Sequence, residues 1–124
     1  DKPVLISEFH FGSRDRGPFW GGVSEAANER ARGDSYRTFL EAALKSPYIV
    51  GAHWFQYLDQ PASGRLLDGE NGHIGLVGIT GLPFAGFVDT VRRSNLAALS
   101  RLSAMASSMP AVEPPPPRED SAGS

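Results

Sequence analysis

The sequence has no cysteine, no excess of basic charge and no long hydrophobic run. Without cysteine the chain can form no disulfide, no thiolate metal site and no cysteine nucleophile. A net charge of -2 over 124 residues gives no general attraction to DNA or RNA. Its apolar stretches are far shorter than the roughly 18 residues of a membrane span, and the first residues do not resemble a signal peptide. We therefore expect no nucleic-acid partner and no membrane span.

Two apolar segments, residues 3–9 and 49–55, have the pattern of buried parallel strands. Apolar residues at three- and four-residue steps predict helices over residues 24–46 and 85–105, and Pro47 ends the first of these. Gly33 is a candidate break in that helix, with Asp34 or Ser35 as the cap of a second half. Residues 58–84 form a long polar loop, in which 74–79 are a candidate short strand.

The order strand, helix, strand, helix predicts an α/β fold built from two βα units of a parallel sheet. Two parallel strands cannot cover their own faces and edges, so these units need further strands for a stable core. The chain also starts without Met, which suggests a piece of a longer protein. We expect residues 1–108 to be part of a catalytic domain and the proline-rich residues 109–124 to be a disordered tail.

A carboxylate stands at the end of the first strand pattern. Residues 4–6 are apolar, and Glu8 follows between Ser7 and Phe9. In a β/α barrel the C-terminal ends of the strands carry the chemistry, and a rigidly held carboxylate can act there as nucleophile or proton donor. The alternative is a solvated glutamate at a strand end.

The second strand pattern ends in polar and aromatic residues. Trp54 offers a flat wall for a sugar ring, with His53 and Gln56 beside it to bind hydroxyls. The alternative is a core tryptophan that packs against the flanking helices.

The loop after this strand is rich in hydrogen-bonding side chains of both signs, a mixture that suits neutral polyols better than phosphates. An ordinary polar surface loop is the alternative. These residues are Asp59, Gln60, Arg65, Asp68, Glu70 and Asn71. His10, His53 and His73 are scattered and form no zinc or calcium motif, so no metal is expected.

Three segments together resemble one enzyme family. They are PVLISEFHFGSRDRG at 3–17, VGAHWFQYLDQP at 50–61 and GRLLDGENGHIG at 64–75. In this order they are similar to the β-agarases of glycoside hydrolase family 50, within the large clan of retaining (β/α)8-barrel glycosidases. The resemblance covers about residues 2–95. It implies that the chain holds the last two βα units of a TIM barrel, strands seven and eight, and is incomplete as an isolated chain.

The resemblance also implies roles for individual residues. In that clan the nucleophile is a Glu at the end of strand seven, which corresponds to Glu8. An aromatic residue, usually Trp, walls the sugar subsite at the end of strand eight, which corresponds to Trp54. No cofactor is implied. The expected substrate-binding residues are His10, His53, Trp54, Gln56, Asp59, Gln60, Arg65, Asp68, Glu70 and Asn71.

The acid/base residue of that clan, a Glu after an Asn at the end of strand four, has no counterpart in this chain. Retaining hydrolysis needs two carboxyl groups about 5 to 5.5 Å apart, so the chain alone is expected to be inactive. Glu70 is a tempting substitute, but its place in the loop after the second strand suits it better to binding substrate or bracing the loop.

Two functions stay open at this point. In the first, the chain supplies the nucleophile half of a secreted or periplasmic β-agarase-like hydrolase. Its partners are then an agar-type galactan and the remainder of the barrel. In the second, the chain is a non-catalytic carbohydrate-binding or interaction module derived from such a barrel.

Overall fold

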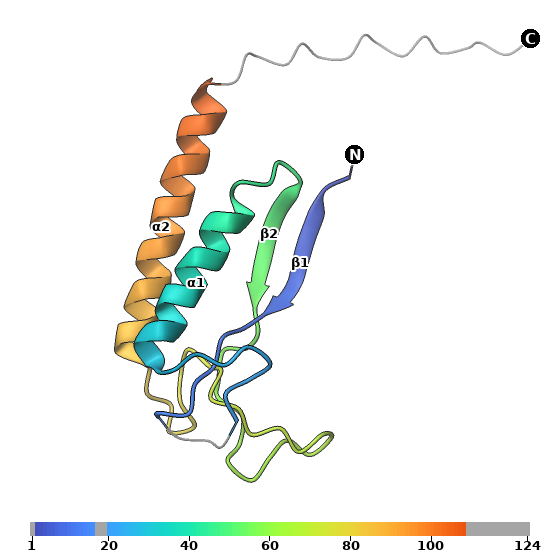
Figure 1. Ribbon diagram of the computed structural model, residues 1–124, viewed down its shortest axis with the longest axis vertical. Coiled ribbons are helices and arrows are strands. Elements are labelled where there is room, and N and C mark those ends of the chain that lie inside the picture. The colour runs from blue at the N-terminus through green and yellow to red at the C-terminus, as the bar shows by residue number, and fades with distance from the viewer. Residues whose placement is uncertain (1, 17–19, 109–124) are drawn as a thin grey trace, which may run out of the picture.

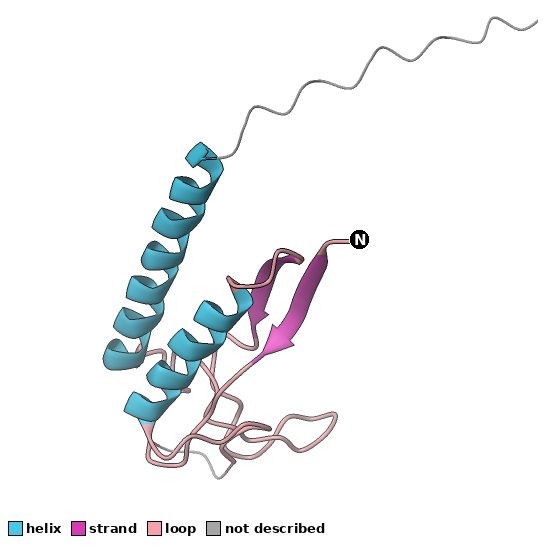
Figure 2. Ribbon diagram, turned by 45° about the horizontal axis from the view of Figure 1, so that its top comes forward, coloured by secondary structure: helices cyan, strands magenta, loops and turns pink. Residues whose placement is uncertain are grey.

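The computed structural model describes residues 2–16 and 20–108. Its elements are β1 (Val4–Phe9), α1 (Glu29–Ala43), β2 (Ile49–Trp54) and α2 (Ala85–Ser108). The two strands are parallel and adjacent, and both helices lie to one side of them (Figure 1, Figure 2). The predicted α/β order and the parallel pairing are confirmed. The expected tail at 109–124 lies outside the described residues.

The pairing of the strands determines where their loops meet. The register joins Val4 to Ile49 and Phe9 to Trp54, with irregular steps between these pairs. Both strands therefore end at the same edge, and the loops that follow them gather there (Figure 1). Residues 10–16 and 20–28 are brought together at this edge with residues 55–84, which lie far from them in the sequence.

Helix α1 begins at Glu29 and not at Ser24, where the apolar pattern predicts it. Asn28 is the N-cap, since its side chain accepts a hydrogen bond from the backbone N–H of Ala31 at 2.9 Å. The preceding residues pair with the segment after β1 instead. The backbone N–H of Gly12 donates to Ser24 at 3.2 Å, and that of Ala26 donates to the carbonyl of Gly12 at 2.7 Å.

Gly33 does not break α1, and neither Asp34 nor Ser35 caps a second helix. The glycine packs against α2, since a Cβ atom there would come within 3.1 Å of the Thr90 side chain. A small residue thus allows the two helices to pack together. The candidate strand at 74–79 is also not formed, since Val77 makes only isolated bridges to Leu58 and Pro83.

An aromatic cluster fills the space between the strands and the helices. The rings of Phe9 and Phe39 stack with centroids 4.3 Å apart, and Trp54 lies 5.3 Å from Phe87. The Tyr36 hydroxyl donates to Asn95 of α2 at 2.7 Å, and burial raises the pKa of this tyrosine. The cluster therefore holds both helices on the same face of the strands.

Much apolar surface remains exposed elsewhere. On the strands, Leu5 is 51% exposed and Val50 is 69% exposed, and most of α2 buries little besides Phe87. None of the helices in the described part of the chain is long and apolar enough to cross a membrane.

The cap of α1 gives a first prediction. Replacing Asn28 by Ala should lower the free energy of unfolding by about 1 kcal/mol, because the Ala31 N–H loses its acceptor. Asn28→Asp keeps a carboxylate oxygen there and should retain most of the stability. Urea unfolding of the protein that contains this segment measures both. Equal stability of the Ala and Asp variants would contradict the assigned cap.

Candidate active site

Glu8 points away from the aromatic cluster. Phe9, the next residue, packs against Phe39 of α1, and successive side chains of a strand point to opposite faces. Glu8 therefore lies on the face opposite the helices, at the C-terminal end of β1, and it is exposed. A carboxylate in this position is accessible to a ligand from the open side of the strands.

His10 lies near Glu8 and has one ring nitrogen committed to the protein. Its Nε2 accepts the backbone N–H of Val23 at 2.9 Å, so the neutral ring carries its proton on Nδ1. Burial lowers the pKa of His10, and the charge of Arg32 lowers it further, whereas the carboxylates of Glu70 and Glu8 raise it. The net direction is downward, which leaves Nδ1–H as a neutral hydrogen-bond donor.

Arg65 is a charged residue near Glu8. Its guanidinium donates to Asp68 at 3.1 Å and to Glu70 at 2.8 Å. The hydrogen bond to Asp68 raises the pKa of Arg65, and the charges of Glu70 and Glu8 raise it further. The Cζ atom lies 5.6 Å from the centre of the Phe55 ring. The arginine therefore stays a cation within a group of carboxylates.

Gln60 is fully buried and holds Glu70 in place. Its amide nitrogen donates to Glu70 at 2.7 Å, and its carbonyl oxygen accepts the backbone N–H of Gly72 at 2.6 Å. All of this supports the loop, so the prediction that Gln60 contacts substrate directly is wrong. Gln60 instead orients the carboxylate of Glu70, which is half-buried.

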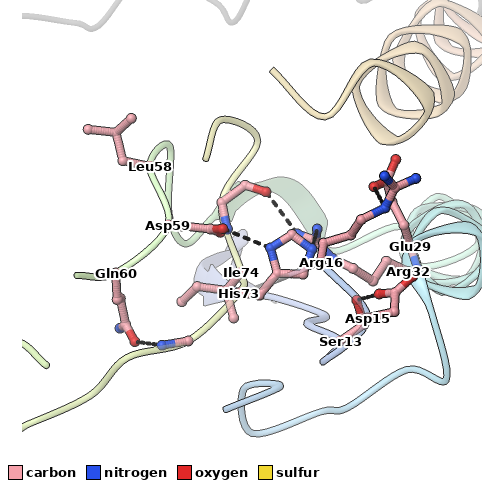
Figure 3. A network of polar contacts seen from close by, with 12 residues as sticks. Ser13, Asp15, Arg16, Glu29, Arg32, Leu58, Asp59, Gln60, His73 and Ile74 are labelled. Carbon is pink, nitrogen blue, oxygen red and sulfur yellow. Dashed lines mark hydrogen bonds and ion pairs between the residues drawn. The ribbon is translucent and has the colours of Figure 1, made fainter. Parts of the chain in front are cut away.

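Arg32, His73 and Asp59 form a buried polar network (Figure 3). Asp59 Oδ2 lies 2.8 Å from His73 Nδ1, and Asp59 Oδ1 accepts the backbone N–H of Gly75 at 2.7 Å. His73 Nε2 lies 2.9 Å from a guanidinium nitrogen of Arg32. Arginine has donors only, so Nε2 must accept and Nδ1–H donates to Asp59. Both carboxylate oxygens of Asp59 are thus occupied inside the protein, and its predicted contact with substrate is wrong.

Trp54 lies on the helix side of the strands, and its predicted role as a sugar platform is wrong. Its ring is 5.3 Å from Phe9 and 5.3 Å from Phe87. Its Nε1–H donates to the carbonyl of Ile74 at 3.1 Å. Because Trp54 is the register partner of Phe9, the two side chains share the face that the helices cover. Trp54 is therefore a core tryptophan that packs against the helices, which is the alternative stated from the sequence.

Phe55 is the aromatic residue that the sequence analysis missed. Its ring centroid is 6.4 Å from that of His10, and the Arg65 guanidinium lies over it. Its backbone N–H donates to the Phe9 carbonyl at 2.9 Å, at the end of the strand pairing. The alternation of the strand could have indicated it, since a tryptophan on the helix side leaves the following residue on the other side.

Four predicted residues remain, namely His53, Gln56, Asp68 and Asn71. His53 is exposed and alternates with Trp54, which leaves it on the Glu8 side of the strands. Gln56 donates its amide to the carbonyl of Leu58 at 2.8 Å and so supports the loop. Asp68 fixes Arg65, and Asn71 is half-buried next to Glu70. Among residues 2–16 and 20–108, no three His, Asp or Glu side chains gather as a metal site would require.

Comparison by sequence relates the chain to known enzymes. No protein-family model matches it. The chain is 46% identical over 95 residues to Beta-agarase B of Vibrio sp. (strain JT0107), and the match covers 77% of this chain and 10% of that protein. This segment is homologous to the beta-agarases.

Solved agarase structures share the same fold over this agarase-like segment. An exo-beta-agarase superposes with a TM-score of 0.77 at 40% identity, over 80% of this chain and 13% of that chain. The agarase AgWH50C superposes with a TM-score of 0.76 at 40% identity, over 80% of this chain and 15% of that chain. The predicted resemblance to family 50 agarases is confirmed, and the chain spans 10% of the length of its curated relatives.

The environment of His10 predicts a lowered pKa for its ring. Its pKa should lie below the ordinary 6.5, because burial disfavours the charged ring. A histidine with a lowered pKa contributes stability that is present above 6.5 and is lost as the pH falls, since protonation of Nε2 ends the bond from Val23. An NMR titration of the ring carbons measures the midpoint, with His10→Gln to assign the signal. A midpoint at or above 6.5 would contradict this environment.

Proposed function

We propose that this chain supplies the nucleophile half of the active site of a retaining β-agarase-like glycoside hydrolase. In this proposal β1 and β2 are strands seven and eight of a (β/α)8 barrel, and Glu8 is the nucleophile. The observation that carries it is the position of Glu8, which ends a strand homologous to the beta-agarases and lies on the face away from the helices. The C-terminal ends of barrel strands are where catalytic residues lie.

The reaction is a double displacement. The Glu8 carboxylate attacks the anomeric carbon while a second carboxylic acid protonates the oxygen of the leaving sugar. The glycosyl ester on Glu8 is then cleaved by water, which that same second residue activates, and the sugar keeps its configuration. The second carboxyl group comes from another strand of the barrel. Glu70 is unsuited to the task, because Arg65 and Gln60 both donate to its carboxylate and hold it within the loop after β2.

The substrate contacts follow from the groups around Glu8. The face of Phe55 offers an apolar surface to a sugar ring, and Nδ1–H of His10 is the donor available to a hydroxyl. Asp68, Glu70 and Glu8 outweigh the single charge of Arg65, which favours a neutral galactan over an anionic one. A polymer of this kind is degraded outside the cytoplasm, so we place the enzyme in the secreted or periplasmic fraction.

The remainder of the barrel is the expected structural partner of this segment. Two parallel strands have two open edges and one uncovered face. Exposed apolar residues such as Leu5 and Val50 lie on these strands and would be covered by neighbouring strands. The described chain is therefore suited to work as a part of a larger domain.

The nucleophile is tested in the full-length enzyme with a 2-deoxy-2-fluoro galactoside, which traps the glycosyl ester. The label should appear on Glu8 in peptide mass spectra. Glu8→Gln should lower kcat at least about a thousandfold, because no ester can form. The control is Glu41→Gln, an exposed carboxylate on α1, which should leave kcat unchanged. A label on any other residue, or an active Glu8→Gln enzyme, would refute the assignment. Carbohydrate binding without any cleavage by the full-length protein would favour the non-catalytic module.

The sugar platform is tested by comparing two neighbouring aromatic residues. Phe55→Ala should raise KM by up to about tenfold, the size of a lost aromatic contact, while Phe55→Tyr should retain most of the affinity. Trp54→Ala should instead lower the free energy of unfolding by about 3 kcal/mol, because it opens the aromatic cluster. Steady-state kinetics and urea unfolding measure the two effects. A raised KM in Trp54→Ala together with a loss of stability in Phe55→Ala would instead make Trp54 the sugar platform.

A further inference from the structure

We propose that Arg32, a buried residue of α1, is a positioning residue for this reaction. It holds the segment after β1, which follows Glu8, at a set distance from the loop after β2, which carries Arg65 and Glu70. The inference rests on the proposed function, since it concerns the geometry around the same nucleophile. Arg32 itself is fully buried and touches no substrate.

The guanidinium of Arg32 joins the two segments through three hydrogen bonds. Its Nε donates to the carbonyl of Phe11 at 2.8 Å. One terminal nitrogen donates to the carbonyl of Gly75 at 2.8 Å, and the other lies 2.9 Å from His73 Nε2. Phe11 belongs to the segment after β1, whereas Gly75 and His73 belong to the loop after β2. One rigid planar group from the helix therefore connects both.

This connection lies just beyond the end of the strand pairing. The last register pair is Phe9 with Trp54, followed by the bond from Phe55 N–H to the Phe9 carbonyl at 2.9 Å. Further along, the two backbones meet through a bond of 3.4 Å from the Ser13 N–H to the His73 carbonyl and one of 2.9 Å from the His73 N–H to the Trp20 carbonyl. The guanidinium thus adds side-chain bonds to the few backbone bonds that join the two segments beyond the strands.

The network continues from Arg32 to the charged residues near Glu8. His73 donates to Asp59, and the next residue, Gln60, donates to Glu70. On the other side Phe11 directly follows His10 and is three residues from Glu8. Arg32 is therefore placed between the two sets of groups that must act on one sugar ring.

The charge of Arg32 argues against a purely stabilising role. Burial lowers its pKa to about 10, although the carboxylates of Asp59, Glu29 and Asp15 raise it. The guanidinium also lies 4.2 Å from the centre of the Phe87 ring. Replacement of buried ion pairs by well-packed apolar side chains of similar volume is often neutral or stabilising, so burial of a charge is weak evidence for a stabilising role. What the guanidinium adds is a fixed geometry, since its planar fork sets the directions of all three bonds.

The expected consequence is a loss of rate with little loss of binding. A displacement of about 1 Å at the reacting groups can cost about a hundredfold in rate. The groups that contact the sugar, such as Phe55 and His10, remain in place to bind it. Removing the guanidinium should therefore lower kcat much more than it changes KM.

The experiment compares Arg32→Met, Arg32→Lys and Arg30→Met in the full-length enzyme. Arg30 is an exposed arginine of the same helix and serves as the matched control. Arg32→Met should lower kcat by about a hundredfold, with KM within about threefold of the original value, and should slow labelling of Glu8 by the fluoro galactoside in parallel. Arg32→Lys keeps the charge without the fork and should lower kcat by about tenfold. Arg30→Met should change neither.

Circular dichroism and thermal melts establish that each variant is folded at the assay temperature. A folded Arg32→Met enzyme with kcat within about threefold of the original, or with an effect on KM alone, would overturn the proposal. If Arg32→Met does not fold, Arg32→Lys decides by the same criterion. An active Glu8→Gln enzyme would instead refute the proposed nucleophile. Loss of activity in Glu8→Gln with full activity in folded Arg32 variants would refute only the positioning role.

Discussion

The buried contact between Arg32, His73 and Asp59 is the interaction on which the arrangement at the strand ends depends. Helix α1 contributes Arg32, the loop after β2 contributes His73 and Asp59, and the carbonyl of Phe11 after β1 accepts a further bond from Arg32. Each hydrogen bond determines the role of the next. The donor-only guanidinium makes His73 Nε2 an acceptor, which gives the Nδ1 proton to Asp59. Asp59 then also fixes the backbone of Gly75. A buried network of this kind has a single arrangement when all of its members are satisfied.

The aromatic cluster sets the second constraint, which is the direction of each side chain. Phe9 and Trp54 are register partners that pack toward the helices. Alternation along a strand then turns Glu8 and Phe55 to the opposite side. The core and the candidate site are thus two faces of the same short sheet, and large changes in the cluster would redirect the carboxylate.

Several features could be predicted from the sequence because they depend on local patterns. The apolar runs predict both strands, and the three- and four-residue spacing predicts both helices. The start of α1 could not be predicted, because residues 24–26 pair with Gly12, a contact that no local pattern contains. The prediction that Asp59 and Gln60 contact substrate is wrong for a similar reason. The sequence does not show whether a polar loop residue faces solvent or is bonded inside the protein, as Asp59 is to His73.

The sequence by itself determined the order of the elements, the polar and aromatic residues at the strand ends, and the relationship to the beta-agarases. These depend on residue types at short spacing and on identity along the chain. Only the tertiary structure decided which aromatic residue accompanies Glu8 and which polar residues brace the loop. The physical reason is that strand register and the buried contacts of Arg32 join residues about 40 apart in the sequence, whose partners no local pattern specifies.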